Sequence, residues 1–133
     1  MILPMIRPYE HRWLTNAVNL AEMSTHPQWK VAAILVKGGR VLSMGVNRYR
    51  NSPAKVGLEG VSYHAEEVAL KRAGDASGAT IYVARVTRSG YLGLAKPCEK
   101  CQELLETHGV RRAVWTTQHG YGKQRIESMS IFR

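Results

Sequence analysis

The sequence has few cysteines, few acidic residues and no long apolar run. Two cysteines among 133 residues are too few for a disulfide-stabilised scaffold, and their C-x-x-C spacing suits a reducing compartment. No apolar stretch is long enough to span a membrane. The opening Met1–Ile6 run is short and interrupted by Pro4, which argues against a signal peptide. We therefore expect a cytoplasmic protein with no membrane partner.

Basic residues outnumber acidic ones by 19 to 10, which gives a formal net charge of +9. A basic protein of this size is expected to meet an anionic partner, and a nucleotide phosphate or a polynucleotide would both qualify. A solubilising surface would produce the same charge, so charge alone does not choose between them. The length predicts a single domain over residues 1–133 that can bury its own core.

Hydrophobic periodicity predicts helices that alternate with strands. We expect a loop over Thr87–Lys96, while Gln118–Arg133 is expected to add a last strand or helix, or to cover a partner subunit. This order of elements is typical of a layered α/β fold. The predicted elements are a helix over Tyr9–Met23, strands over Lys30–Lys37 and Arg40–Val46 joined by Gly38-Gly39, a helix over Ser62–Ala73 with Ser62 as its N-cap, a strand over Thr80–Val86, a helix over Cys98–His108, and a strand over Val110–Thr117.

Two short motifs supply three soft metal ligands and one further carboxylate. His64 opens the first motif, and Cys98 and Cys101 lie in the second, Pro97-Cys98-Glu99-Lys100-Cys101. A catalytic zinc ion keeps three protein ligands and one open position, and it lowers the pKa of water towards neutrality. Glu66 lies two residues beyond His64, where it could accept a proton from water and pass it to a substrate. The pattern predicts Zn²⁺ bound by His64, Cys98 and Cys101, with Glu66 as the catalytic residue.

The two cysteines have other possible roles. A C-x-x-C pair can be a redox pair, as in thioredoxin-like proteins. It can also be half of a structural zinc site, but such a site needs four ligands and the chain has no third cysteine. The order of the motifs and their positions at helix starts favour the catalytic zinc site.

The two motifs together resemble those of the cytidine/deoxycytidylate deaminase superfamily, whose zinc enzymes carry H-x-E followed by P-C-x-x-C. The resemblance covers most of the chain. It implies a three-layer α/β/α cytidine-deaminase-like fold with a mixed, roughly five-stranded sheet. It also implies substrate contacts from Asn47, Ala65 and Pro97, and it suggests a homo-oligomer. The basic loop after Asn47 could grip a phosphate, which makes Arg48 and Arg50 further substrate-binding candidates.

Within the superfamily, the segments 46–50, 62–66 and 81–85 resemble small deoxycytidylate-deaminase-like proteins, which are often found in phages. If a phage encodes the chain, it would act in the host cytoplasm. The segment 109–115 also resembles the tRNA-adenosine deaminase branch. The resemblance therefore implies hydrolytic deamination of cytosine in a deoxycytidylate-like nucleoside or nucleotide. The alternatives are a deaminase acting on cytosine or adenine in single-stranded DNA or RNA, including tRNA, and a zinc-stabilised binding module without turnover.

Overall fold

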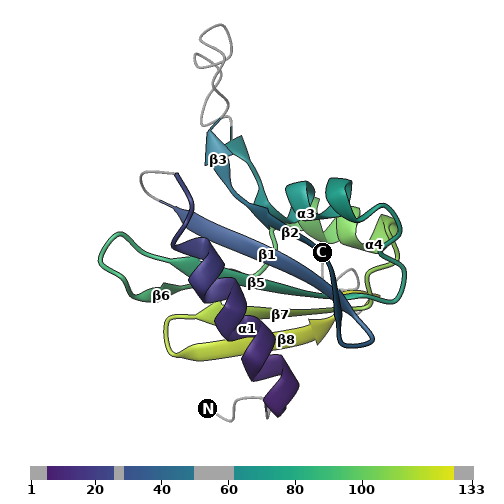
Figure 1. Ribbon diagram of the computed structural model, residues 1–133, viewed down its shortest axis with the longest axis horizontal. Helices are drawn as coiled ribbons and strands as arrows, with labels where there is room; N and C mark the ends of the chain where they lie inside the picture. The colour runs from purple at the N-terminus through teal and green to yellow at the C-terminus, as the bar shows by residue number, and fades with distance from the viewer. Residues whose placement is uncertain (1–5, 26–28, 50–61, 128–133) are drawn as a thin grey trace, which may run out of the picture.

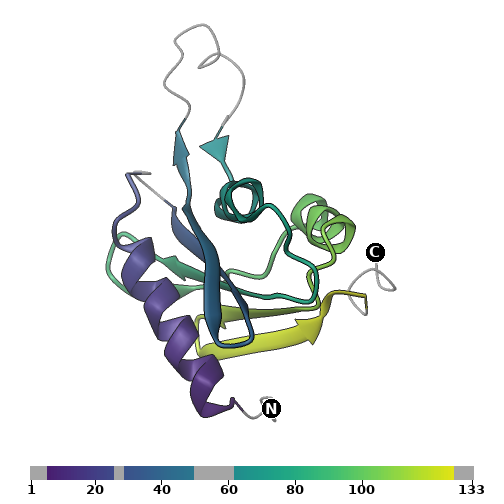
Figure 2. The same cartoon turned by 45° about the vertical axis from the view of Figure 1, so that its right-hand side comes forward.

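The computed structural model describes residues 6–25, 29–49 and 62–127. A mixed sheet forms the middle layer, with α1 on one face and α3 and α4 on the other (Figures 1 and 2). The expected three-layer α/β/α fold is confirmed. The elements are α1 (Pro8–Ala21), β1 (Lys30–Lys37), β2 (Arg40–Val46), β3 (Arg48–Tyr49), β4 (Ser62–Tyr63), α3 (Ala65–Ala73), β5 (Thr80–Val86), β6 (Leu92–Gly93), α4 (Glu99–Thr107), β7 (Arg112–Thr117) and β8 (Gly120–Arg125).

The main sheet has the strand order β2-β1-β5-β7-β8, and β6 pairs with the end of β5. β5 and β7, which precede and follow α4 in the sequence, are parallel, whereas the other pairs of this sheet are antiparallel. Gly38 and Gly39 join β1 to β2 with φ values of +58° and +75°. Such a two-residue turn matches the twist of a hairpin and favours glycine. β8 is the fifth strand along this order, so the expected last strand is present at Gly120–Arg125. Residues 128–133 fall outside the described part of the chain, and covering a partner subunit stays a prediction.

The apolar run of β1 is buried on both sides, because its side chains alternate between two cores. Ala33 and Leu35 pack into the cluster beneath α3 and α4, while Ile34 and Val36 pack into the cluster beneath α1. A strand covered on both faces needs apolar residues at every position, not only at alternate ones. This accounts for the continuous apolar stretch 31–36.

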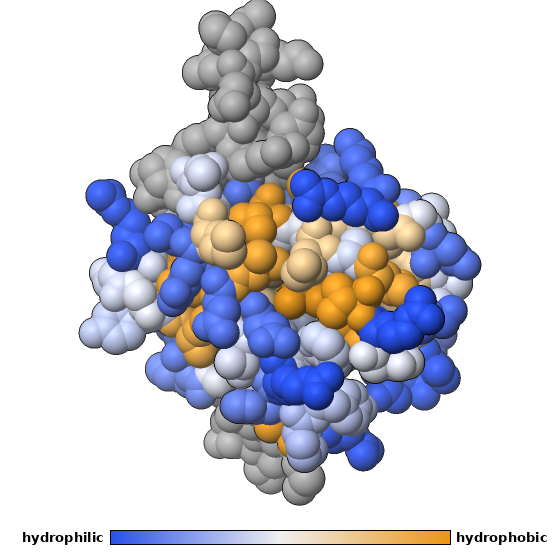
Figure 3. All heavy atoms as spheres, viewed as in Figure 1, coloured by the Kyte–Doolittle hydropathy of each residue, from blue (hydrophilic) through white to orange (hydrophobic). Residues whose placement is uncertain are grey.

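Helix α1 covers β1, β5 and β7 but leaves part of the edge strand β2 open. Val41 and Met44 pair with Val36 and Ile34, so they lie on the α1 side of the sheet, where they are 41% and 46% exposed. Apolar side chains remain visible on this face among charged ones (Figure 3).

The predicted homo-oligomer stays a prediction. In the described ranges, no helix combines the length and apolar character that crossing a membrane requires.

Gly45 sets the distance between β2 and the first turns of α3. A Cβ at Gly45 would lie 2.7 Å from the backbone nitrogen of Ala69 and 2.9 Å from the Cβ of Val68, and it would also contact the carbonyl of Ala65. Only a residue without a side chain allows α3 to lie this close to the strand. The start of α3, which carries the first motif, therefore depends on this glycine.

Two local predictions are wrong. Ser62 is not the N-cap of the first motif helix: it pairs with Tyr49 in the β3–β4 ladder, and α3 begins at Ala65 with His64 as the N-cap. The pairing holds residues 62 and 63 extended, so the helix starts three residues later than expected. The predicted loop 87–96 also contains β6, because Leu92 and Gly93 pair with the last residues of β5.

Candidate metal centre and active-site pocket

The predicted metal ligands come together where the N-termini of α3 and α4 meet. His64 is the N-cap of α3 and Cys98 the N-cap of α4, and both have extended backbones that turn their side chains out of the helix. Cys101 lies in the first turn of α4. The ligand atoms of all three lie within 4.8 Å of one another, and His64 Nδ1 is 3.6 Å from Cys101 Sγ.

This donor set fits zinc. One imidazole nitrogen and two sulfurs are the soft ligands that zinc prefers, and three of them leave a tetrahedral position open. Cys101 is buried, whereas Cys98 is exposed and lines the adjoining pocket together with His64. The open coordination position would therefore face the pocket, as a catalytic site requires and a closed structural site does not.

The helix N-terminus and burial affect the pKa of the Cys101 thiol in opposite directions. The N-terminus of α4 favours a thiolate. In the metal-free protein, however, burial raises the pKa of Cys101 well above its ordinary value, and the nearby Glu66 carboxylate adds to that shift. Cys101 is therefore a neutral thiol until a cation binds. Zinc binding must displace its proton, which couples metal affinity to pH.

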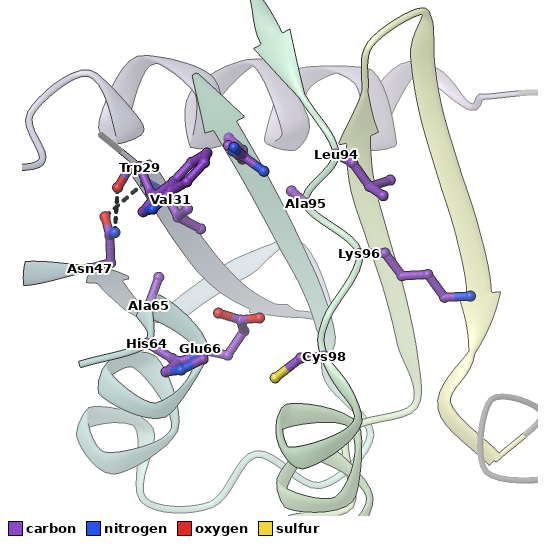
Figure 4. A pocket seen from close by; sticks show the side chains of 11 residues that line it. Trp29, Val31, Asn47, His64, Ala65, Glu66, Leu94, Ala95, Lys96 and Cys98 are labelled. Carbon is purple, nitrogen blue, oxygen red and sulfur yellow. Dashed lines mark hydrogen bonds between the residues drawn. The ribbon is translucent and has the colours of Figure 1, made fainter. Parts of the chain in front are cut away.

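Glu66 lies in the first turn of α3 and is only 6% exposed. Figure 4 shows its carboxylate extending into the pocket beside His64 and Cys98. Burial raises the pKa of Glu66, while its own backbone N–H and the neighbouring His64 lower it by smaller amounts. A raised pKa makes a carboxylate a better proton acceptor, which suits a group that takes a proton from water and returns it. The neighbouring Glu67 does not line the pocket and instead pairs with Lys100 of α4 at 3.7 Å.

The pocket beside the three ligands has a volume of about 290 Å³. Its walls come from the ends of β1, β2 and β5, the start of α3 and the segment that leads into α4 (Figure 4). Among the predicted substrate-binding residues, Asn47 and Ala65 line it. The lining residues are Trp29, Val31, Asn47, His64, Ala65, Glu66, Arg85, Leu94, Ala95, Lys96 and Cys98.

The other predicted substrate-binding residues stay predictions. The Pro97 side chain is fully buried, and the pocket wall runs through its neighbours Lys96 and Cys98 instead. Arg48 lies in β3, but its side chain and the whole of Arg50 fall outside the described part of the chain.

Asn47 holds together the strand ends at one side of the pocket. Its Oδ1 accepts hydrogen bonds from the Ser24 hydroxyl at 2.7 Å and from the Val31 backbone N–H at 2.8 Å, and its Nδ2 donates to the Trp29 carbonyl. These bonds use both acceptor positions of the amide and one of its two N–H donors. Asn47 therefore positions the chain around Trp29, and its contact with the substrate stays a prediction.

Trp29, Val31 and Arg85 are lining residues that the sequence motifs did not indicate. Val31 of β1 pairs directly with Arg85 of β5, so the sheet register brings them together from distant parts of the chain. The position of Arg85 in the pocket wall depends on strand pairing that no local pattern reveals, whereas Lys96 directly precedes Pro97 of the second motif.

Comparison with known proteins identifies a family. The family model described as "Cytidine and deoxycytidylate deaminase zinc-binding region" matches residues 8–117. This span includes the three ligands, Glu66 and every residue that lines the pocket.

Among curated proteins, the riboflavin biosynthesis protein RibD of Aquifex aeolicus (strain VF5) is 31% identical to this chain, over 96% of the chain and 35% of that protein. The chain spans about a third of the length of the curated relatives it matches.

Two solved structures have a similar fold. The dCMP deaminase of the cyanophage S-TIM5 matches with a TM-score of 0.66 and 20% identity, over 85% of this chain and 86% of that one, and it has also been solved in complex with dCMP and dUMP. The cytidine deaminase of Burkholderia pseudomallei matches with a TM-score of 0.67 and 23% identity, over 90% and 94%. At these identities the likeness concerns the fold.

Proposed function

This chain belongs to the cytidine and deoxycytidylate deaminase zinc-binding family, and we propose that it converts the cytosine base of a deoxycytidine nucleotide or nucleoside to uracil with release of ammonia. As a member of this family it is a zinc-dependent deaminase, a hydrolase of C–N bonds. The observation that carries the proposal is the buried carboxylate of Glu66 in a pocket beside three zinc ligands.

Pocket size and charge support a nucleotide as substrate. A volume of about 290 Å³ lies just below the usual range for ligand pockets, roughly 300–1,000 Å³, which suits a ligand no larger than a single nucleotide. Arg85 brings positive charge to its wall. The cyanophage enzyme of similar fold has been solved with dCMP and dUMP, which makes dCMP the first substrate to test.

His64, Cys98 and Cys101 would hold the zinc ion, which when bound supplies a Lewis acid that lowers the pKa of water. Glu66 accepts a proton from the attacking water as its oxygen forms a bond to the ring carbon that bears the amine. Glu66 then gives this proton to the ring nitrogen. It next accepts the hydroxyl proton of the tetrahedral adduct and passes it to the amine, so that the C–N bond breaks, ammonia leaves and the carbonyl forms. The raised pKa of Glu66 and its exclusion from bulk water suit a group that accepts and returns protons in one cycle.

A second candidate is deamination of a base in single-stranded nucleic acid. The connection between β5 and β6 and the segment after it expose Arg88, Tyr91 and Leu94, the latter two at 74% and 56%. Exposed aromatic and basic side chains next to a pocket can bind an unpaired strand, and a deaminase needs its target base unstacked. A zinc-stabilised module without turnover is the least supported alternative, because such a protein has no need of the Glu66 carboxylate.

The test is a substrate panel with the zinc-loaded protein, in which mass spectrometry follows the replacement of amine by carbonyl. The panel contains deoxycytidine, dCMP, adenosine, guanine and a single-stranded oligonucleotide, each incubated in parallel with the Glu66→Ala variant. The proposal is supported if the unmodified protein deaminates dCMP or deoxycytidine and the Glu66→Ala variant does not. Turnover of the oligonucleotide alone would replace it with the nucleic-acid alternative.

A further inference from the structure

Arg85 is held at the end of the pocket by the register of the sheet. Ile81 and Val83 of β5 point into the core beneath α3 and α4, so Arg85, two residues further along, points to the same face. It pairs with Val31 of β1 on one side and with Gly93 of β6 on the other. At this position the core gives way to the pocket, which Arg85 lines.

Two contacts fix the guanidinium of Arg85. Its Cζ lies 4.0 Å from the centroid of the Trp29 ring, a stacked cation–π arrangement. A Cβ on Gly93 would lie 3.1 Å from Arg85 Cδ and 3.2 Å from both Cγ and Nε, so the glycine leaves room for the side chain to lie flat against β6. Trp29 is itself positioned by Asn47, which donates a hydrogen bond to its carbonyl.

The Arg85 side chain also has a buried hydrogen-bond donor without an acceptor. Within residues 6–25, 29–49 and 62–127 it forms no ion pair with a carboxylate, and its buried Nε has no hydrogen-bond partner. A buried donor without an acceptor is unfavourable, and a charged one more so. A ligand that brings oxygen acceptors to the guanidinium would relieve this. A planar guanidinium held in one orientation is well suited to bind phosphate with two parallel hydrogen bonds.

We propose that Arg85 is a specificity-determining residue that binds a phosphate of the substrate, either the monoester of a free nucleotide or a diester in a strand. The proposal rests on the proposed function, which places the base beside His64, Cys98 and Glu66. Trp29 and Val31 lie across the pocket from these three residues (Figure 4). Arg85 stacks on the Trp29 ring and pairs with Val31 in the sheet. A base at the zinc ligands would thus direct its sugar and phosphate towards Arg85. This assigns to Arg85 the role that the sequence suggested for Arg48 and Arg50.

The experiment measures binding separately from turnover. Isothermal titration calorimetry on the zinc-loaded Glu66→Gln protein compares deoxycytidine with dCMP, adenosine with its monophosphate, and a single-stranded oligonucleotide. The same titrations are repeated with Arg85→Gln and with Arg40→Gln added. Arg40 is exposed at the start of β2 and does not line the pocket, so its variant removes an equal charge without touching the site.

Loss of the guanidinium is expected to weaken binding of the phosphate-bearing ligand by about 10- to 100-fold and to leave nucleoside binding unchanged. Arg40→Gln should change the binding of neither ligand. Arg85→Lys keeps the charge but loses the two-pronged geometry, and it should give an intermediate loss even if Arg85→Gln folds poorly. Equal losses for nucleoside and monophosphate, unchanged binding in Arg85→Gln, or no binding of any phosphate-bearing ligand would overturn the assignment.

The choice of ligands distinguishes a phosphate monoester from a diester. Comparison with the substrate panel distinguishes failure of the phosphate site from failure of the proposed deaminase function. Arg85-dependent binding of the monophosphate identifies a free nucleotide, and the same dependence only for the oligonucleotide identifies a diester. If binding depends on Arg85 but the substrate panel shows no deamination, the proposed function fails and the phosphate site stands. If deoxycytidine and dCMP are deaminated equally well with and without Arg85, the proposed function stands and the phosphate site fails.

Discussion

Replacing Gly45 with alanine should damage the active site through the position of α3. The added Cβ would lie 2.7 Å from the Ala69 backbone nitrogen, whereas ordinary contact begins at 3.4 Å. Because the closest atoms belong to the backbone of α3, no side-chain rotation can relieve the clash. The helix must move away from β2 by more than half an ångström, and it carries His64 and Glu66 at its start.

The Gly45→Ala substitution is expected to lower both the stability of the protein and its catalytic rate. Overpacking of this kind lowers the free energy of unfolding by about 1–3 kcal/mol. A displacement of catalytic groups by about 1 Å can reduce the rate by about 100-fold, so we expect kcat/KM to fall by roughly 10- to 100-fold in Gly45→Ala. Zinc affinity should also fall, because His64 moves relative to Cys98 and Cys101.

The assay pairs urea denaturation with steady-state kinetics and a zinc-chelator competition. Gly38→Ala is the matched control: nothing lies within 4 Å of a Cβ there, but its φ of +58° disfavours alanine, at a cost of about 1–2 kcal/mol. It should lose stability with zinc affinity and kcat/KM intact. If Gly45→Ala behaves like Gly38→Ala in all three measurements, the reasoning that Gly45 positions the active site is refuted.

Three further predictions concern the ligands and Asn47. Cys98→Ser and Cys101→Ser should each lose zinc as measured by atomic absorption, and only the buried Cys101 should also destabilise the metal-free protein; unchanged zinc in both would contradict the ligand assignment. Because burial raises the pKa of Cys101, its thiol keeps its proton in the metal-free protein, and apparent zinc affinity should fall as pH is lowered, by about tenfold per pH unit for each proton displaced; a pH-independent chelator competition would contradict this. Asn47→Ala removes the partners of the Val31 N–H and the Trp29 carbonyl and should lower the free energy of unfolding by about 1–3 kcal/mol; a change below a few tenths in urea denaturation would contradict it.

The parts of the fold that the sequence predicted are those with strong local patterns. The strands 30–37, 40–46 and 80–86 have the predicted bounds, because apolar residues and the Gly38-Gly39 turn mark them without reference to the rest of the chain. The metal ligands were equally visible, since the chemistry restricts which residue types can stand in such a motif.

Strand pairing over long distances explains what the sequence did not reveal. Ser62 is a good N-cap residue by type, but pairing with Tyr49 keeps it in a strand. β6 has only two residues, and it exists because β5 continues far enough to pair with it. β8 carries mostly polar and glycine residues, so only its pairing with β7 marks it as a strand.

Long-range strand pairing also explains which pocket residues the sequence did not indicate. His64, Glu66 and the cysteines lie in short motifs, but Trp29 and Arg85 reach the pocket only because β1 and β5 pair in one register. Asn47 was predicted as a substrate contact, and the structure adds internal hydrogen bonds that its sequence neighbours could not indicate.

The most direct test of the account measures zinc content and turnover together in Glu66→Ala. The account predicts a zinc content equal to that of the unmodified protein, with deamination reduced by at least about 100- to 10,000-fold, the usual contribution of a general acid–base group. Loss of zinc would make Glu66 a ligand, and zinc-replete protein with undiminished turnover would remove it from the chemistry. Either result would contradict the proposed mechanism.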